Sequence, residues 1–497
     1  MNAHSIKSFH LPIILALAGI ALQCTALATP NILLILSDDH SLPHVGAYGD
    51  ENCLNSNITP NLDAFAKESM RFNRGYTTAA QCAPSRTSIF TGCSPIETRT
   101  SRFAQPARSS RTFFTEVLQR NGYWVGTGGR NHHLTGRGRD GPHIQEAFTE
   151  MGIGIADLME RFDLVSTCRT KGEDMAKVGE NFSMVLDKIP ENKPFFLYFG
   201  FNQPHRGFGN DHEGIDPDKL ILPKDWPDLP EVRLDYARYL AEVRDMDYCF
   251  GKVMEVLEQR GLKENTIVIF MGDNGEALLR GKGTLYNRGI NVPLMVRWPD
   301  RIKSGTTSDI LVSGMDLGPT ILAAAGLETP GYMAGISFLP ELLGRPFESR
   351  QYIFAERGWH FGHLTDTEGF DLCRAIISDK YHYIYNAIPN NPYSPVDMRF
   401  KDAWLAIKEA PSLPSPYKRL YRDTPRPFVE IFDVDKDPFQ LNNLFGKPEM
   451  EEIEREMRIA LEKQMIREGD FVPLITDILG FTDYRNVLKK QSNQATE

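Results

Sequence analysis

Asn31-Ile32-Leu33-Leu34-Ile35-Leu36 is an almost unbroken apolar run of strand length, and this stretch decides the fold. Its lack of polar alternation is typical of a strand that is covered on both faces. Three other runs share the pattern: 195–199 (FFLYF), 266–271 (TIVIFM) and 292–296 (VPLMV). Between them lie helical patterns, with a helix start at Thr59-Pro60 and an apolar stripe over 240–258. We therefore expect an α/β fold with a doubly wound, mainly parallel sheet flanked by helices.

The composition changes after about residue 345. Residues 389–427 are rich in proline, which predicts loop rather than regular structure. Residues 373–377 and 381–385 have the pattern of short antiparallel strands, and 447–467 that of a charged amphipathic helix. We expect a leader over 1–28, a catalytic α/β domain over 29–345, and a C-terminal subdomain over 346–497 with a small antiparallel sheet and a helix.

Residues 1–28 have the features of a secretory signal peptide. Lys7 precedes an apolar stretch over 11–22, and Ala26-Leu27-Ala28 offers small residues before a cleavage point. A membrane anchor is the alternative, but about a dozen apolar residues are too few to cross a bilayer. A lipoprotein site at Cys24 is disfavoured because Gln23 stands where a small residue is usual. We expect export to the periplasm or the outside, without a stable membrane anchor.

Charge and cysteine content narrow the classes of partner and site. The net charge of −10 argues against a nucleic-acid partner bound through overall charge. A chain of 497 residues can bury an ample core, so it needs no disulfide framework. Six of the seven cysteines follow the leader, and they show no C-x-x-C pair and no zinc spacing. The sequence leaves their connectivity open.

Acidic pairs follow two of the expected strands. Asp38-Asp39 ends the first, and Asp273-Asn274 follows the run over 266–271. Because open α/β sheets gather ligands at the carboxyl ends of strands, we expect the two pairs to meet. One such pair alone could form an Asx turn, but two at two strand ends favour a metal site. Three carboxylates and an amide oxygen favour Ca²⁺, with Mg²⁺ as the alternative, over zinc.

A motif of high specificity lies between these pairs in the sequence. Cys82-Ala83-Pro84-Ser85-Arg86, followed by Thr91-Gly92, closely resembles the signature of the type I sulfatases, members of the alkaline phosphatase superfamily. The alternative is a buried structural cysteine beside a Pro-Ser turn. The resemblance implies that a formylglycine-generating or sulfatase-maturating enzyme oxidises Cys82 to Cα-formylglycine, whose hydrate is the nucleophile. A thiolate would be left as a stable S-sulfo adduct, whereas the second hydroxyl of the hydrate can collapse and expel sulfate.

The resemblance extends to both acidic pairs. The segments LLILSDDH (33–40) and VIFMGDNGE (268–276) resemble the metal-binding segments of this family. By that resemblance Asp38, Asp39, Asp273 and Asn274 bind a divalent cation, usually calcium, and the modified Cys82 completes the shell. Arg86 lies four residues after Cys82, on the same face of a helix, and the resemblance implies that it positions the formylglycine.

A histidine pair follows a segment, 122–134, that resembles the family pattern GYxTxxxGKWHLG. Arg130 stands where lysine is usual, and Asn131 where tryptophan is usual. Counting without gaps places the family histidine at His132, whereas matching the next leucine places it at His133; we prefer His132 and keep both. The resemblance implies that this histidine takes the proton when sulfate leaves, and arginine at 130 keeps a charge that can bind sulfate.

Two further segments complete the resemblance. His205, in Asn202-Gln203-Pro204-His205, would protonate the leaving oxygen, and Lys282, in the GKGTLY segment 281–286, would contact the sulfate. The chain departs from the family pattern at Asn287, Arg288 and Asn291, which leaves Lys282 in place.

The region 99–139 is basic although the chain is acidic. It contains one acid, Glu116, and eight arginines: Arg99, Arg102, Arg108, Arg111, Arg120, Arg130, Arg137 and Arg139. These residues either attract an anionic polymer or form a solvated face, and the sequence does not favour one reading. In the C-terminal part, Trp359, His360 and His363 are candidate substrate contacts.

The motifs cover most of residues 30–325 in order, and they predict a sulfuric ester hydrolase. We expect an exported sulfatase that hydrolyses sulfate monoesters of a sulfated saccharide. Two alternatives stay open: a phosphodiesterase or phosphonate monoester hydrolase of the same superfamily, and a non-catalytic sulfoglycan-binding protein.

Overall fold

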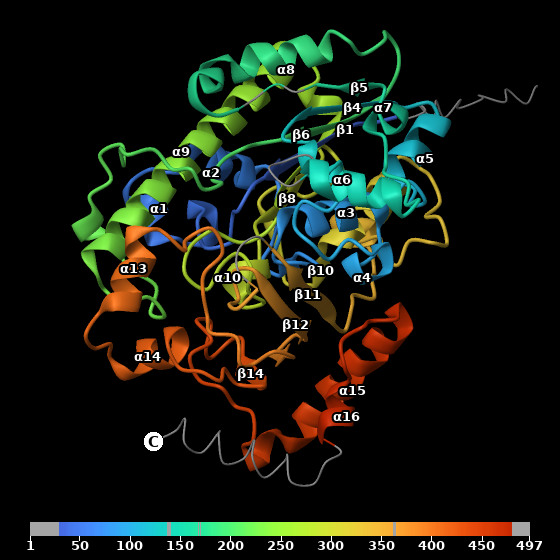
Figure 1. The fold of residues 1–497 in the computed structure, drawn as a ribbon. Helices are drawn as coiled ribbons and strands as arrows, with labels where there is room; N and C mark the ends of the chain where they lie inside the picture. The colour runs from blue at the N-terminus through green and yellow to red at the C-terminus, as the bar shows by residue number, and fades with distance from the viewer. Residues whose placement is uncertain (1–28, 137–140, 167, 169, 361–363, 480–497) are drawn as a thin grey trace, which may run out of the picture.

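A mixed eight-stranded sheet forms the centre of the computed structural model, which describes residues 29–136, 141–166, 168, 170–360 and 364–479 (Figure 1). The strand order is β5-β4-β6-β1-β7-β8-β2-β9, and β8 alone runs against the others. The strands are β1 (Asn31–Ser37), β2 (Met70–Phe72), β4 (Trp124–Gly129), β5 (Leu164–Val165), β6 (Phe195–Gly200), β7 (Thr266–Gly272), β8 (Leu294–Arg297) and β9 (Thr306–Ser308). A separate parallel pair joins β3 (Gly75–Tyr76) to β10 (Val312–Ser313).

Helices cover both faces of this sheet, as a doubly wound fold requires (Figure 1). On β1, Leu33 and Ile35 face one layer, while Ile32, Leu34 and Leu36 face the other. The first layer contains α1 (Glu51–Asn55), α2 (Pro60–Lys67), α8 (Val178–Leu186) and α9 (Pro230–Gln259). The second contains α3 (Cys82–Thr91), α5 (Phe114–Arg120), α7 (Leu158–Arg161), α11 (Leu317–Ala324) and α12 (Leu339–Leu342). The predicted α/β fold is confirmed.

The C-terminal part forms a four-stranded antiparallel sheet, also as expected. Its strands are β11 (Ile353–Trp359), β12 (Phe370–Ile377), β13 (Tyr381–Asn386) and β14 (Val429–Asp433). One face packs against α15 (Glu451–Glu468) and α16 (Ile475–Leu479). Ala355, Ala375 and Ile384 on the other face pack against Tyr76 and Leu285, which joins this sheet to the main domain. The division of the chain between residues 345 and 346 remains our proposal.

Short helices lie in the connections. They are α4 (Pro95–Thr98), α6 (Gly141–Glu150), α10 (Asn287–Ile290), α13 (Asp402–Glu409) and α14 (Ser415–Tyr421). Turns of 3₁₀ helix span Gly46–Tyr48, His132–Leu134, Gly172–Lys177, Pro217–Lys219, Lys263–Asn265, Gly314–Asp316 and Pro448–Met450.

The prediction of irregular structure over 389–427 is wrong where α13 and α14 form. Prolines begin α14 instead of breaking it, because Pro414 is its N-cap and Pro416 lies in its first turn. In α13, Trp404 and Ile407 are buried in the core cluster that includes α9. Tertiary packing therefore stabilises two helices in a segment whose composition favours loop.

Other expectations hold with shifted bounds. The apolar stripe over 240–258 belongs to the longer α9, and the strand expected over 292–296 begins at Leu294. Pro60 begins α2, but the Thr59 hydroxyl does not cap it; this oxygen instead accepts a hydrogen bond from the Gly46 amide at 2.9 Å.

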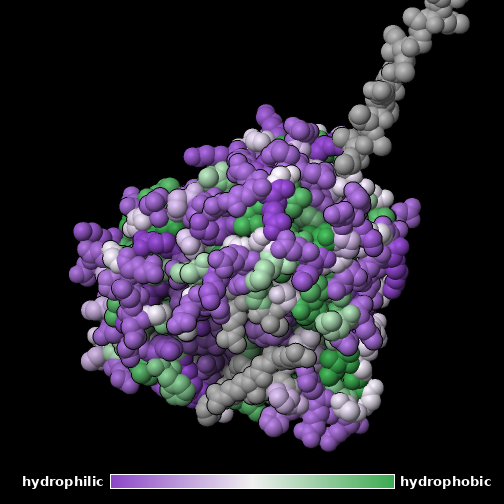
Figure 2. Space-filling model, turned by 90° about the horizontal axis from the view of Figure 1, so that it is seen from above, coloured by the Kyte–Doolittle hydropathy of each residue, from purple (hydrophilic) through white to green (hydrophobic). Residues whose placement is uncertain are grey.

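The face shown in Figure 2 is mainly hydrophilic, and the cysteines form no disulfide among the described residues. On the face in Figure 2, hydrophilic side chains predominate and apolar ones form small separate patches. The six cysteines of the described part are unpaired. In that same part, no helix has the length and apolarity to cross a bilayer. The predicted signal peptide, residues 1–28, and His363 lie outside the described residues.

Candidate active site

Four neighbouring parallel strands bring the predicted residues to one edge of the sheet. Strands β4, β6, β1 and β7 are adjacent, and each is followed by a segment with a predicted site residue. Arg130 follows β4, His205 lies beyond β6, Asp38 follows β1, and Asp273 follows β7. The shared strand direction therefore gathers these side chains at the carboxyl edge, where α/β sheets bind ligands.

The acidic residues form a buried cluster with Cys82. Ligand atoms of Asp38, Asp39, Asp273 and Cys82 all lie within 4.8 Å of one another, and all four residues are fully buried. Ser37 pairs with Gly272 in the sheet, so the two acidic pairs begin side by side. The Asp39 amide donates to Asp273 Oδ1 at 3.0 Å, which fixes the turn after β1 against the turn after β7.

The oxygen atoms of this cluster are suitable ligands for a hard cation. Asn274 Nδ2 donates to Asp39 Oδ1 at 2.8 Å, whereas Asn274 Oδ1 is buried without a hydrogen-bond partner. Burial, together with repulsion by Asp38, raises the pKa of Asp39 to about 6 and that of Asp273 to about 7. Three carboxylates and an unsatisfied amide oxygen in one dry site match the oxygen-rich shell of calcium or magnesium.

Cys82 is the first residue of α3 and points at the carboxylates. Its Sγ lies 3.5 Å from Asp38 Oδ1 and 3.8 Å from Asp39 Oδ1. Burial and the charge of Asp38 raise the pKa of the Cys82 thiol well above its usual range. The unmodified side chain is therefore a neutral thiol and a poor nucleophile.

Arg86 binds two of the carboxylates from the next turn of α3. Its Nη2 donates to Asp38 Oδ2 and its Nε to Asp273 Oδ2, each at 2.9 Å, and the side chain is fully buried. The spacing of four residues places it on the Cys82 side of the helix, as predicted. Arg86 also donates to the Tyr198 hydroxyl, a contact between segments 112 residues apart that no motif marks.

Lys282 joins the cluster through Asp39. Its Nζ lies 2.9 Å from Asp39 Oδ1 and 3.0 Å from Asp397 Oδ2. Although burial opposes it, Lys282 holds the pKa of Asp397 below its usual range. Sequence reasoning missed Asp397, because it lies in a proline-rich segment that follows no strand and carries no motif.

Of the two histidines left open, the structure brings His133 to the carboxylates. His133 Nε2 lies 3.6 Å from Asp38 Oδ2 and accepts from Arg130 Nε at 2.9 Å, and Arg130 Nε is 2.5 Å from Asp38 Oδ2. His132 is only partly buried, and its ring centroid lies 4.2 Å from that of His133, with the two ring planes tilted by 35°. The 3₁₀ turn His132–Leu134 places the second histidine, and not the preferred His132, next to Asp38, so the geometry favours His133 while both stay candidates.

His205 approaches Asp39 from the segment after β6. Its Nε2 lies 3.8 Å from Asp39 Oδ2, and its Nδ1 donates to the carbonyl of Arg206 at 2.8 Å. That hydrogen bond leaves Nε2 as the nitrogen that faces the cluster. Burial and the cations Arg130 and Lys282 lower the pKa of His205 to about 3.

The C-terminal candidates line the region beside the cluster. His360 is buried, and its ring centroid lies 4.4 Å from that of Phe103. Lys282 Nζ lies 5.5 Å from the centroid of the same Phe103 ring. Trp359, the residue before His360, is by contrast 41% exposed.

Two protein-family models and several known proteins match this chain. The sulfatase family model matches residues 30–327, and a model of the N-sulphoglucosamine sulphohydrolase C-terminal region matches 275–398. An ulvan-active sulfatase of Formosa agariphila is 27% identical, over 89% of this chain and 75% of its own length.

Two solved structures share the fold. One, a complex with its substrate D-glucosamine-2-N,6-O-disulfate, has a TM-score of 0.66 and 19% identity and covers 90% of this chain and 99% of its own. The other, a phosphonate monoester hydrolase of Agrobacterium radiobacter, has a TM-score of 0.64 and 17% identity and covers 88% and 96%.

Proposed function

The chain belongs to the sulfatase family, and from this premise we propose that it is an exported enzyme that removes sulfate from a sulfated glycan, with residue 82 as its nucleophile after conversion to formylglycine. One observation carries the proposal. Cys82 lies among three buried carboxylates, and Arg86, Arg130 and Lys282 surround the same point. A cluster of this kind can hold a cation and an anion together against one side chain.

The acidic residues would hold the cation. Asp38, Asp39, Asp273 and Asn274 supply four oxygen ligands, and the side chain of residue 82 is close enough to join them. When bound, calcium or magnesium would supply positive charge beside the sulfate oxygens. Conversion of Cys82 to formylglycine would supply a hydrated aldehyde, a nucleophile that the neutral thiol cannot replace.

The basic residues bind and orient the sulfate group. Lys282 and Arg130 each contact a carboxylate on one side and can donate to sulfate on the other. Arg86 is held by Asp38 and Asp273, so it fixes the position of residue 82 rather than reaching outward. These cations stabilise the charge that accumulates on sulfate oxygens during the reaction.

Two histidines handle protons. His205 presents Nε2 to the cluster and donates a proton to the leaving oxygen, and His133 accepts the proton when sulfate is released from residue 82. The cations Arg130 and Lys282 disfavour the charged form of His205 in the free enzyme. An anionic sulfate bound between them counters that field, so the imidazole can carry a proton in the complex.

The assignment of His133 leads to a matched pair of variants. We expect His133→Ala to lower kcat by about 10²- to 10⁴-fold, the usual contribution of a general acid or base. His132→Ala should lower kcat much less, because His132 is only partly buried and it is His133 whose Nε2 lies 3.6 Å from Asp38 Oδ2. Steady-state kinetics of the two variants, at equal formylglycine content, compare them directly. A larger loss in His132→Ala would reverse the assignment.

The substrate class follows from the relatives and from context. An ulvan-active sulfatase and a structure bound to a sulfated glucosamine both resemble this chain. The predicted signal peptide would carry the enzyme to a compartment where it meets such polymers. We therefore propose a sulfated saccharide as substrate and a formylglycine-generating enzyme as the maturation partner.

A substrate panel separates this proposal from its alternatives. We expect the matured enzyme to release sulfate from defined sulfated saccharides, and to cleave phosphonate monoesters and phosphodiesters with a lower kcat/KM. Ion chromatography of free sulfate and phosphorus-31 NMR measure both reactions in the same preparation. A phosphonate or phosphodiester kcat/KM above the sulfatase value would favour the related hydrolase. Saccharide binding with no turnover of any ester would favour a binding protein.

A further inference from the structure

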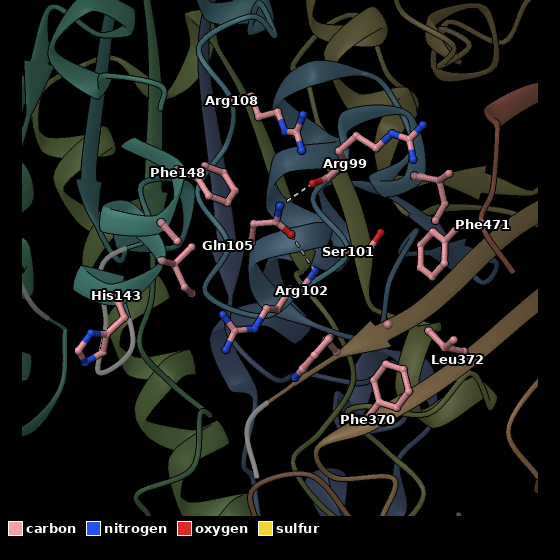
Figure 3. A pocket seen from close by; sticks show the side chains of 15 residues that line it. Arg99, Ser101, Arg102, Gln105, Arg108, His143, Phe148, Phe370, Leu372 and Phe471 are labelled. Atoms are coloured by element: carbon pink, nitrogen blue, oxygen red, sulfur yellow. Dashed lines mark hydrogen bonds between the residues drawn. The ribbon is translucent and has the colours of Figure 1, made fainter. Parts of the chain in front are cut away.

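A cavity of about 840 Å³ lies beside the catalytic cluster, between the 99–108 segment, helix α6 and the C-terminal sheet (Figure 3). We call it the arginine pocket, because Arg99, Arg102 and Arg108 line it. In the view of Figure 3, Phe148 and His143 of α6 lie on the left and Phe471 and Phe370 on the right, with Gln105 between them and Arg99 and Arg108 above. The mechanism above uses none of these residues.

The positive charge in the arginine pocket is not neutralised. Among the described residues, none of its three arginines forms an ion pair with a carboxylate, and the Nε atoms of Arg102 and Arg108 are buried without a hydrogen-bond partner. Burial and the nearby cations Arg99 and Arg111 lower the pKa of Arg108. Arg99 is exposed, and Arg102 and Arg108 are partly buried. An acidic ligand would give these guanidinium groups charge-assisted hydrogen bonds that no carboxylate of the described residues supplies.

Aromatic rings accompany the cations. The guanidinium of Arg102 lies 5.8 Å from the ring centroid of Trp359, and that of Arg108 lies 5.9 Å from the centroid of Phe148. Phe370 packs edge-on against Trp359 with centroids 5.1 Å apart, while 41% of Trp359 stays exposed. A ring that is firmly supported yet open to solvent can pack against the apolar face of a sugar.

The wall of the arginine pocket is held in place by backbone contacts. The Trp359 amide donates to the carbonyl of Ser101 at 3.3 Å, and the Phe103 amide donates to that of Trp359 at 2.8 Å. A Cβ on Gly358 would lie 2.4 Å from the Ser101 oxygen, so this approach requires glycine. Gln105 also accepts from the Arg102 amide and donates to the Arg99 carbonyl, at 3.2 and 2.6 Å.

Phe103 separates the arginine pocket from the catalytic cluster. Its ring centroid lies 5.8 Å from that of His133, and it packs in one apolar cluster with Cys82 and Ile144. Ile144 also lines the pocket, as does Arg102, the residue before Phe103. The pocket and the nucleophile therefore lie on two sides of one side chain.

We propose that the arginine pocket binds a second acidic group, a sulfate or a uronate carboxylate, on a sugar next to the one that loses its sulfate. The preferred substrate is then a polyanionic oligosaccharide rather than a singly sulfated sugar. This inference rests on the proposed function, because it takes the ligand to be another part of the same substrate. It assigns a role to the arginine-rich region 99–139, for which the sequence left two readings open; Arg137 and Arg139 lie outside the described residues.

Isothermal titration of the inactive Cys82→Ala protein with a fully sulfated glycosaminoglycan tetrasaccharide tests the pocket without turnover. We expect the added triple change Arg99→Gln, Arg102→Gln and Arg108→Gln to raise Kd by about tenfold or more. The dependence of Kd on salt should also become weaker. Arg120→Gln is the matched control: Arg120 belongs to the same basic region, is exposed, and does not line the pocket. It should leave Kd unchanged.

The outcomes separate this inference from the proposed function. Equal Kd in the triple variant and its parent, at equal melting temperature, would refute the arginine pocket, as would an equal loss in Arg120→Gln. Failure of the matured wild type to release sulfate from any ester would refute the proposed function and leave the binding result standing. A carboxyl-reduced tetrasaccharide identifies the acidic group that the pocket binds. Equal Kd of this ligand for the triple variant and its parent indicates a carboxylate, whereas a lower Kd for the parent indicates a sulfate. Either result, after a loss of affinity for the unreduced ligand, supports the pocket.

Discussion

Cys82→Ala is expected to abolish sulfate release, with kcat lowered by on the order of 10⁴- to 10⁶-fold, the loss typical of removing a covalent nucleophile. Alanine leaves the carboxylates and the cations in place, so the substrate can still bind. It removes only the side-chain atom that would attack sulfur. Sulfate release under single-turnover conditions measures the effect.

A second cysteine provides the control. Cys93 is also buried and lies two residues beyond α3, but the metal-ligand group that contains Cys82 does not include it. Cys93→Ala should keep the turnover of the parent at equal formylglycine content. If Cys82→Ala retained near-normal activity in protein with an unchanged melting temperature, the nucleophile would have to be another residue.

Asp273→Asn is expected to lose bound metal and turnover together. The change keeps the size of the side chain but removes a charge that the cation needs, and it weakens the contact with Arg86 Nε at 2.9 Å. Loss of a residue that only supports metal ligands costs about 10- to 100-fold, so loss of a ligand should cost more than about 100-fold. Metal content by mass spectrometry, followed by kcat at saturating calcium, measures both effects.

The matched control for this variant is Asp247→Asn. Asp247 is buried in α9 and accepts from the amides of Asn61 and Leu62, so it is a structural carboxylate outside the cluster. Asp247→Asn should lower the melting temperature and leave the metal content per folded molecule unchanged. Retention of both metal and rate in Asp273→Asn would mean that the cation binds elsewhere.

The part of the site that the sequence predicts is the part attached to strand ends and to one helix. Asp38 and Asp273 could be placed together because apolar runs identify β1 and β7, and parallel neighbours end at one edge. Arg86 could be placed because the side-chain direction of a helix repeats after four residues. These inferences depend on local periodicity, which a single sequence displays.

The parts of the site and of the fold that the sequence does not predict depend on contacts between distant segments. Asp397 contacts Lys282, and Phe103 contacts His133. Both Asp397 and Phe103 lie in loops without periodicity, so no sequence pattern predicts these contacts. Which of His132 and His133 lies near Asp38 depends on one 3₁₀ turn, which a residue count cannot resolve. Helix α13 likewise forms because Trp404 and Ile407 find a partner in α9.

The chemistry of residue 82 is the central claim, and it can be measured as a proportion. Preparations made with different amounts of maturation enzyme should contain different fractions of the Cys82 peptide about 18 Da lighter, the mass of formylglycine relative to cysteine. Peptide mass spectrometry gives this fraction, and sulfate release gives kcat for the same sample. We predict that kcat rises in proportion to the fraction and extrapolates to zero in its absence. Full turnover in protein that carries only cysteine at position 82 would contradict the account.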